Sequence, residues 1–315
     1  MQRQAVIRGL VLLGVASFGA GLLFFIGGPT IVASRLTHRI WDLGHLGLFG
    51  TLTALSFWAL YDRCSKWRPR SVNCAVLGTV FLVGAVIEWL QAIVGREASW
   101  EDVGRNLVGA FLVAAFFNPG SPPLARPVRH GLKVVAIAAL VWALIPLMRT
   151  SYDEYQRYQQ FPTLSDFTAK FERDRWVATY GSKAELSRDL SDQTGRESLK
   201  VELGSDLYAG IALSSPFRDF RLYKRLHLKI FNPSPRVLDM TCRINDLPHD
   251  NERSDRFSRP FDLKPGWNEV TFSVDEIRHS PQNREMEMSK VRVLMLFRPQ
   301  PSPTETIYVD KVWLD

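Results

Sequence analysis

The chain has 315 residues, of which 46% are hydrophobic, and a formal net charge of +7. The charge is uneven: residues 1–150 carry a net charge of +8, and residues 151–315 a net charge of −1. Because the basic excess lies among long apolar runs, it indicates membrane topology signals rather than a nucleic-acid-binding surface.

Five apolar segments of the first half approach the length of about 20 residues that a bilayer requires. They are residues 8–27, 43–61, 74–94, 102–118 and 131–148, the fourth of which begins with a polar turn. The first segment also resembles a signal peptide, because Arg3 and Arg8 precede its apolar stretch. Since no A-x-A cleavage site follows and four more spans do, we expect an uncleaved helix.

The basic residues of the short loops predict the orientation. With the N-terminus in the cytoplasm, the opposite side receives Arg35, Arg39 and Arg96. The cytoplasmic side receives Arg3, Arg8, Arg63, Lys66, Arg68, Arg70, Arg126, Arg129 and Lys133. Basic residues favour the cytoplasmic side, so this bias predicts a multi-pass protein of the bacterial inner membrane. Five spans then place the C-terminal half outside the cytoplasm.

Polar residues interrupt these spans at helical spacing. The set comprises Asp42, His45, Glu88, Gln91, Arg96, Asp102 and Asn106. Glu88 and Gln91 share one helical face, and Asp102, Asn106 and Gly109 share another, on which Gly109 permits close helix contact. If the second, third and fourth spans pack together, these residues converge. Charged side chains inside a membrane are costly unless they pair with one another or bind a ligand, so the set predicts a site for a lipid or a lipid-linked headgroup.

Each of these residues also has a structural interpretation. Ser99 and Asp102 have the spacing of a capping box at the start of the fourth span. Glu101 and Arg105 have the spacing of a surface ion pair. Asn106 suits a hydrogen bond between helices, and His45 an interfacial position. A packing network therefore stays open beside the binding site.

The segments WDLGHLGLFGTL and EWLQAIVGREASWEDVGRNLVGAFL resemble the VanZ-like family of small bacterial membrane proteins over about residues 40–120. The family pattern is Asp-Lys-x-x-His, Glu-x-x-Gln, a loop Arg, and Asp-x-x-x-Asn with a following Gly. The matching residues are Asp42, His45, Glu88, Gln91, Arg96, Asp102, Asn106 and Gly109. Leu43 replaces the family's lysine, which removes one positive charge. The resemblance implies a role in the cell envelope and a link to teicoplanin resistance, but no settled activity.

After residue 150 the pattern changes. We expect a polar linker over residues 151–160 between a membrane domain, 1–150, and a separate domain, 161–315. Seven segments of the second domain alternate with a period of two: SLKVEL, GIALSS, RLHLKIF, LDMTCRI, NEVTFSV, KVRVLMLF and IYVDKVWL. Such alternation between turn signals predicts an all-β antiparallel sandwich. Three cysteines without metal-binding spacing give no reason to expect a zinc site or a cofactor.

The segments FERDRWVATYG, GRESLKVEL, LYKRLHLKIFNPS, LKPGWNEVTFSV and IYVDKVWLD resemble the galactose-binding-like jelly rolls of carbohydrate-binding modules. In such folds an early acidic loop and an aspartate of the last strand often hold a structural calcium ion. The resemblance therefore implies Glu172, Asp174 and Asp310 as calcium ligands, with plain turn residues as the alternative.

Sugar binding requires exposed aromatic rings with polar groups beside them. Trp176, Tyr208 and Trp267 are the aromatic candidates, although Trp267 also suits packing over the sandwich edge. Charged residues crowd the loop RINDLPHDNERSDRF, from which Asp246, His249 and Arg253 are candidate glycan contacts. A solvated charged loop is the alternative.

Three classes of function remain. The leading hypothesis is non-enzymatic: the sandwich binds envelope glycan, and the membrane residues contact a lipid-linked headgroup. The first rival is an intramembrane enzyme with Glu88 or His45 as the acid–base group. The absence of a nucleophile with a paired base in the sequence disfavours it. The second rival is a membrane anchor that presents a protein-binding sandwich.

Overall fold

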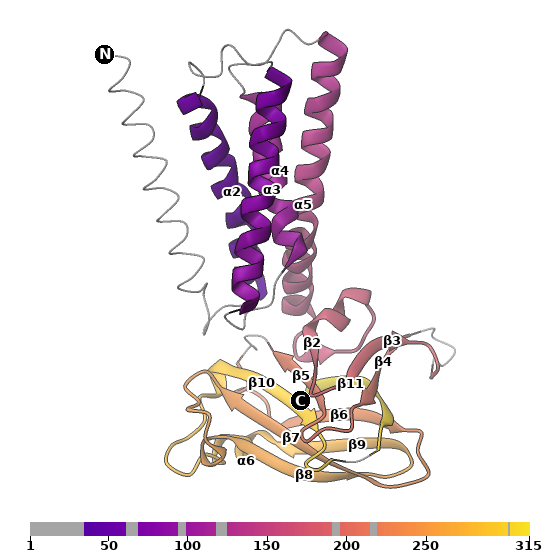
Figure 1. Ribbon diagram of the computed structural model, residues 1–315. Coiled ribbons are helices and arrows are strands. Elements are labelled where there is room, and N and C mark those ends of the chain that lie inside the picture. The colour runs from indigo at the N-terminus through magenta and orange to yellow at the C-terminus, as the bar shows by residue number, and fades with distance from the viewer. Residues whose placement is uncertain are drawn as a thin grey trace. The chain divides into compact units, whose positions relative to one another are not determined.

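The computed structural model describes residues 35–60, 69–93, 99–117, 125–190, 196–214, 219–301 and 303–315. The chain divides into two compact units with the boundary between Thr150 and Ser151. The first is helical and the second is built from strands (Figure 1). Some predicted features lie outside the described residues: the first span, Arg96, and five basic residues of the orientation signal, namely Arg3, Arg8, Arg63, Lys66 and Arg68.

The helical unit contains α2 (Arg35–Leu60), α3 (Pro69–Ile93), α4 (Trp100–Phe116) and most of α5 (Arg126–Gln160). By length and composition, two described stretches could cross a membrane: Asn73–Ile93 in α3, and α5. Helix α4 has 17 residues, fewer than the about 20 that a bilayer requires. Helix α2 has 26 residues and is long enough, but it does not meet the combined criterion of length and composition. The expectation of five membrane helices thus rests on two clear candidates among the described helices.

Helix α4 packs against both α2 and α3, as the sequence predicts. A small apolar core of Phe49, Val80 and Ala110 joins the three helices. At Gly109 the backbones of α2 and α4 approach so closely that a Cβ atom would collide with the carbonyl group of Leu46. The predicted role of Gly109 in close helix contact is therefore confirmed.

The second unit is a two-sheet antiparallel sandwich, which confirms the predicted architecture. One sheet has the order β3-β4-β11-β6-β9, with β1 also paired to β11, and the other has the order β2-β5-β10-β7-β8. The strands are β1 (Thr163–Ser165), β2 (Trp176–Thr179), β3 (Lys183–Ser187), β4 (Ser198–Leu203), β5 (Gly210–Ser214), β6 (Arg225–Asn232), β7 (Leu238–Asp246), β8 (Phe257–Leu263), β9 (Gly266–Ser273), β10 (Val291–Phe297) and β11 (Glu305–Leu314).

Alternating side chains from the two sheets form one core. In β6, Leu226, Leu228 and Ile230 are fully buried, while Lys229 reaches the outer face and pairs with Asp310. In β7, Ile244 faces the core and lies beside Phe257 of β8. Their neighbours Arg243 and Ser258 therefore face the outer side of the second sheet.

The predicted polar linker, residues 151–160, is helical: it forms the last turns of α5. Arg175, fully buried at the end of a 3₁₀ helix (Lys170–Arg175), holds these turns to the sandwich. Its guanidinium group lies 2.7 Å from Asp153 and 3.6 Å from Glu172, and it donates a hydrogen bond of 3.2 Å to Gln160. Tyr152 adds an edge-to-face contact with Phe171.

Replacing Gly109 by alanine should destabilise the helical unit. Alanine is favoured over glycine inside a helix by about 0.5–1 kcal/mol of folding free energy. The clash of the new Cβ atom with Leu46 costs about 1–3 kcal/mol, which outweighs this gain. We expect Gly109→Ala to lower the melting temperature in detergent. Gly78→Ala is the matched control, because a Cβ atom there meets nothing within 4 Å. Equal melting temperatures for the two variants would contradict the close contact.

Replacing Asp153 by asparagine should destabilise a fragment of residues 151–315. Breaking a buried ion pair costs about 3–5 kcal/mol, and Glu172 beside Arg175 should keep the loss near the lower end. Asp174→Asn is the control, because the Asp174 side chain is 70% exposed. Urea unfolding followed by circular dichroism measures both. A β-rich spectrum with unchanged stability in Asp153→Asn would show that Arg175 does not hold the helix end.

Candidate functional site

The helical unit contains a buried polar cluster, which we define as His45 of α2, Glu88 of α3, and Asp102, Arg105 and Asn106 of α4. All of these except Asp102 are at most 6% exposed. The structure thus brings together four residues that the sequence predicted as a set, and it buries a fifth, Gln91, on α3. Asp42 is partly exposed, pairs with Arg39 at 3.3 Å and lies within electrostatic range of His45.

His45 has a defined orientation. Its Nδ1 atom lies 3.1 Å from Oδ1 of Asn106. An amide oxygen only accepts, so Nδ1 carries a hydrogen and donates it. The other ring nitrogen, Nε2, then faces Oδ2 of Asp102 at 3.8 Å. At 3.8 Å the imidazole and the carboxylate are in electrostatic contact but share no hydrogen bond.

Arg105 belongs to the cluster, although its sequence spacing predicts a position on the surface. Its side chain is 6% exposed and pairs with Asp102 as well as with Glu101, at 2.9 Å from the latter. The predicted ion pair with Glu101 does form. Of the two partners, however, only Glu101 lies on the surface, and Arg105 is buried. The contact with Asp102 brings a guanidinium group into the cluster, where sequence alone offered only Arg96.

Glu88 caps the start of α4 from the neighbouring helix. Its Oε2 atom accepts a hydrogen bond of 2.7 Å from the backbone N–H of Ser99, the residue before α4. The Ser99 side chain makes no cap bond, so the predicted capping box does not form. Asp102 is therefore available to Arg105 and His45, and the negative charge of Glu88 lies at the positive end of the α4 dipole.

A cation could also be held in this cluster. His45, Glu88 and Asp102 each offer one ligand atom, and these atoms lie within 4.8 Å of one another. A second such group among the described residues is His249, Asp250 and Asp255 in the sandwich. Arg105 competes for Asp102 in the first group, as Arg284 does for Asp255 in the second.

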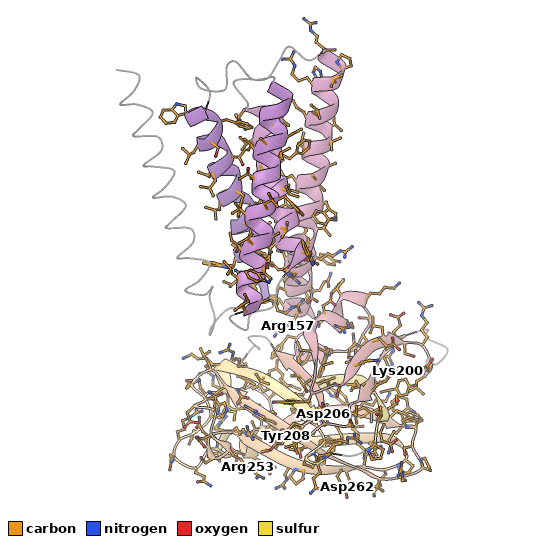
Figure 2. The ribbon with its side chains drawn as sticks, in the orientation of Figure 1. Arg157, Lys200, Asp206, Tyr208, Arg253 and Asp262 are labelled. Carbon is orange, nitrogen blue, oxygen red and sulfur yellow. The ribbon has the colours of Figure 1, made fainter. Side chains whose placement is uncertain are left out.

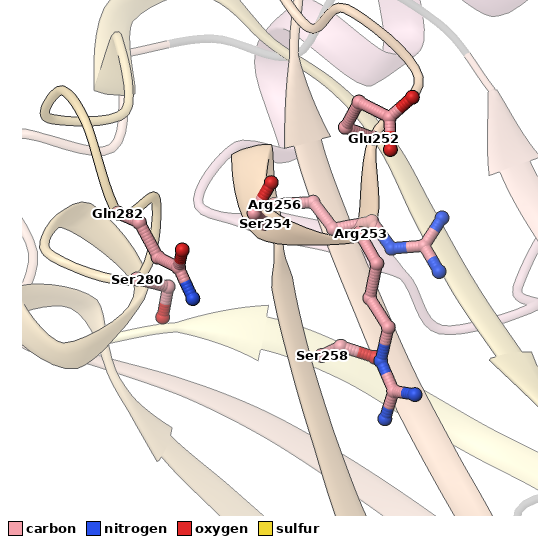
Figure 3. Close-up of a pocket in the computed structure, with 7 residues that line it drawn as sticks. All are labelled: Glu252, Arg253, Ser254, Arg256, Ser258, Ser280 and Gln282. Carbon is pink, nitrogen blue, oxygen red and sulfur yellow. The ribbon is translucent and has the colours of Figure 1, made fainter.

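A cavity of about 480 Å³ opens on the sandwich beside the second sheet (Figure 3). Its lining is polar throughout: Glu252, Arg253, Ser254, Arg256, Ser258, Ser280 and Gln282. Ser280 and Gln282 lie on the wall opposite the two arginines (Figure 3). The backbone N–H of Gln282 donates to the carbonyl of Ser254 at 2.9 Å, which ties the two walls together.

Arg284 holds the loop that carries this cavity. Its guanidinium group binds Asp246 at 2.6 and 2.7 Å and Asp255 at 2.5 and 2.9 Å. The hydrogen bonds from Arg284 lower the pKa of Asp255 to about 2. Asp246, a predicted glycan contact, is fully buried by this interaction, so it supports the loop and does not line the cavity.

His249, another predicted glycan contact, is also used within the protein. Its Nδ1 atom donates to the carbonyl of Asp255 at 2.8 Å, which leaves Nε2 to accept from Arg243 at 3.2 Å. Of the three predicted loop residues, only Arg253 lines the cavity.

Exposed aromatic rings lie near the cavity. Tyr180 and Tyr208 are 56% and 42% exposed, with ring centroids 6.0 Å apart, and Tyr208 also packs on Phe297 of β10. Tyr208 lies within electrostatic range of Arg256, and Tyr180 within that of Arg243. Figure 2 labels Tyr208 and Arg253 on the sandwich. Tyr180 was not predicted from the sequence.

Both tyrosines have left-handed backbones, with φ of 49° and 65°. Such a conformation costs a residue other than glycine about 1–3 kcal/mol, and it recurs at ligand sites. Tyr180 and Gly181 form the centre of a tight turn that the bond from Ser182 N–H to the Thr179 carbonyl closes at 3.1 Å. Asparagine suits such a turn better than tyrosine.

The other predicted aromatic residues differ in exposure. Trp176 is 1% exposed and donates to Ser165 within the core, so it offers no platform. Trp267 is 50% exposed on the other sheet, with Lys229 4.6 Å above its ring.

The structure does not bring the three implied calcium ligands together. Glu172 is fully buried and accepts hydrogen bonds from the backbone N–H groups of residues 166, 167 and 169. Asp174 is exposed, and Asp310 pairs with Lys229 at 2.9 Å. The three residues therefore do not form the implied calcium site. The carboxylate of Glu172 instead binds the backbone of its own loop.

Replacing Glu88 by alanine should destabilise the helical unit, because the partly buried Ser99 N–H then loses its acceptor, at a cost of up to about 1–3 kcal/mol. Glu88→Gln keeps an acceptor oxygen and should recover most of the loss. Glu101→Gln, at a side chain that is 69% exposed, is the control. Thermal unfolding in detergent measures all three. A Glu88→Ala variant as stable as the control would contradict the capping role.

No protein family model matches the chain, and no curated protein matches it. Solved structures resemble the sandwich distantly. The family 11 carbohydrate-binding module from Clostridium thermocellum, in complex with a β-1,3-1,4-mixed-linked tetrasaccharide, is 14% identical, with a TM-score of 0.37 over 48% of this chain and 93% of that one. An exo-β-agarase is 13% identical, with a TM-score of 0.39 over 49% of this chain and 24% of that one. Similarity at this level assigns no function to the chain.

Proposed function

We propose that the protein is a multi-pass membrane protein of the bacterial envelope whose extracytoplasmic sandwich binds a glycan. The observation that carries the proposal is the exposed pair Tyr180 and Tyr208 next to the polar cavity. The apolar C–H faces of sugar rings pack against aromatic rings, and sugar hydroxyl groups require donors and acceptors beside them. The serine, glutamine and arginine side chains of the cavity supply both.

The backbone strain at the two tyrosines supports the same proposal. Neither ring is needed to fill the core, since both are exposed, and yet both residues hold costly left-handed conformations. A ligand that packs on the rings gives a reason for keeping them there.

The exposed surface of the helical unit supports membrane insertion. Leu82, Val86 and Trp89 of α3 are more than half exposed, as are Val134 and Trp142 of α5. Only 11% of the apolar window of α5 is buried within the protein. Apolar surface of this extent requires a nonpolar surrounding, and the basic residues of the loops favour a cytoplasmic N-terminus.

A second candidate function belongs to the polar cluster of the helical unit. A buried imidazole, two carboxylates and a guanidinium group on three packed helices are costly unless they serve a ligand or a proton. We propose that the cluster contacts the headgroup of an envelope lipid, such as a lipid-linked glycan precursor. The resemblance to VanZ-like proteins makes altered sensitivity to teicoplanin the phenotype to examine in a deletion strain. Catalysis at His45 or Glu88, and a sandwich that binds a protein, remain the rival proposals.

Removing the Tyr180 ring should weaken glycan binding about two- to tenfold, since an aromatic contact contributes about 0.5–1.5 kcal/mol. Tyr180→Asn is the sharpest variant, because asparagine accepts the left-handed backbone. The measurement is retention of the full-length protein in affinity electrophoresis through a panel of envelope polysaccharides. Trp267→Ala on the other sheet is the control. A loss of binding in Trp267→Ala with none in Tyr180→Asn would move the site to the other sheet, and no retention by any polysaccharide would refute the proposal.

A further inference from the structure

The positive charge of the sandwich cavity is not balanced by the protein. Arg253 and Arg256 line the cavity, and Arg243 lies on the same outer face, beside Ser258 in the register of β7 and β8. Within the described residues none of these three arginines forms an ion pair. The lining contains two guanidinium groups and a single carboxylate, that of Glu252, and Arg243 adds a third cation on the same outer face.

Two carboxylates of this loop do not correct the imbalance, because they are already paired with another arginine. Asp246 and Asp255 both bind Arg284, and His249 presents its Nε2 lone pair, not a charge, to Arg243. The Nε atoms of Arg243 and Arg256 are buried and have no hydrogen-bond partner in the protein. A buried donor without an acceptor costs about 1–3 kcal/mol, and more when it is charged.

The arginines also act on one another. Burial and the neighbouring Arg256 lower the pKa of Arg243, and burial and the neighbouring Arg253 lower the pKa of Arg256. Clustered cations without counter-charges store unfavourable energy in the unliganded protein, and an anion between them relieves it. The guanidinium fork is the donor geometry that carboxylates and phosphates accept in bidentate form.

We propose that the glycan bound by the sandwich is acidic, and that Arg243, Arg253 and Arg256 bind its carboxylate or phosphate groups while Tyr180 and Tyr208 pack on its rings. This inference rests on the proposed glycan function and adds the chemical class of the ligand. Neutral glycans of the same backbone carry no negative charge to balance the three arginines, and they bind more weakly.

The test uses the full-length protein in detergent and three polymers: polygalacturonate, its methyl ester, and a poly(glycerol phosphate). The first two share one backbone and differ in charge, and the third replaces carboxylate by phosphate. We expect at least tenfold tighter binding to one of the acidic polymers than to the methyl ester. The preferred polymer identifies the anion, and the affinity should fall as salt is added.

Arg256→Gln and Arg253→Gln should each weaken binding to the preferred acidic polymer at least tenfold. The matched control is Arg259→Gln, which removes the same charge from β8 at a residue that pairs with Glu276 outside the cavity. The melting temperature of Arg256→Gln should not fall, because the change removes an unbalanced cation. Arg253 is exposed, so its variant keeps the test valid if Arg256→Gln unfolds.

The outcomes separate the two proposals. Equal binding of polygalacturonate and its methyl ester, with loss in Tyr180→Asn, overturns the acidic ligand and leaves glycan binding intact. Equal losses in Arg259→Gln and Arg256→Gln show attraction to general surface charge and overturn the site. Binding of none of the three polymers by a protein that is retained by a neutral polysaccharide overturns the acidic ligand alone, and retention by no polysaccharide overturns both.

Discussion

The bidentate binding of two aspartates by one arginine, Arg284, is the constraint on which the sandwich cavity depends. Asp246 ends β7 and Asp255 precedes β8, so Arg284 fixes the two ends of the loop that joins these strands. The loop then presents Arg253 and Arg256 on one wall. Because Arg284 occupies the aspartates, the cavity arginines receive no counter-charge from them. The stability of the loop and the charge of the cavity therefore have the same cause.

The polar cluster of the helical unit follows the opposite rule, since its charged groups have partners inside the protein. Asp102 meets Arg105 and His45, and Glu88 meets the N-terminus of α4. Helix packing at Gly109 brings these groups within reach of one another. In a nonpolar surrounding, unbalanced charge is far more costly than on a wetted sandwich. Each unit thus has the charge arrangement that its proposed surrounding permits.

Much of the sandwich could be predicted from the sequence, because apolar residues at every second position predict a strand with one buried face. Leu226, Leu228 and Ile230 identify β6 without any tertiary information. Strand β8 escaped prediction because Pro260 interrupts its pattern, which only an edge strand tolerates. The helical end over residues 151–160 escaped because it has no apolar stripe: a buried arginine 22 residues beyond Asp153 holds it.

The candidate sites were predictable where their residues follow helical spacing within a span and match the VanZ-like pattern. His45, Glu88, Gln91, Asp102 and Asn106 follow helical spacing and could be grouped. Arg105 could not be placed, since its spacing to Glu101 is equally typical of a surface pair. Arg284 lies 38 residues after Asp246, and no local pattern links them. Tyr180 left a weak signal, a large aromatic residue where a tight turn before glycine favours asparagine.

Cys242, in the middle of β7, has a consequence for the chemistry of the second unit. Its thiol is fully buried, and burial raises its pKa, so it offers almost no thiolate to an oxidant or alkylating reagent. Cys64 and Cys74 both belong to the first 150 residues, so residues 151–315 contain no other cysteine. The sandwich can therefore enter an oxidising compartment without mispaired disulfides. A cysteine introduced at Ser254, on the exposed rim of the cavity, would be the one reactive thiol of this unit, available to a fluorescent label while the native sequence of the core stays intact.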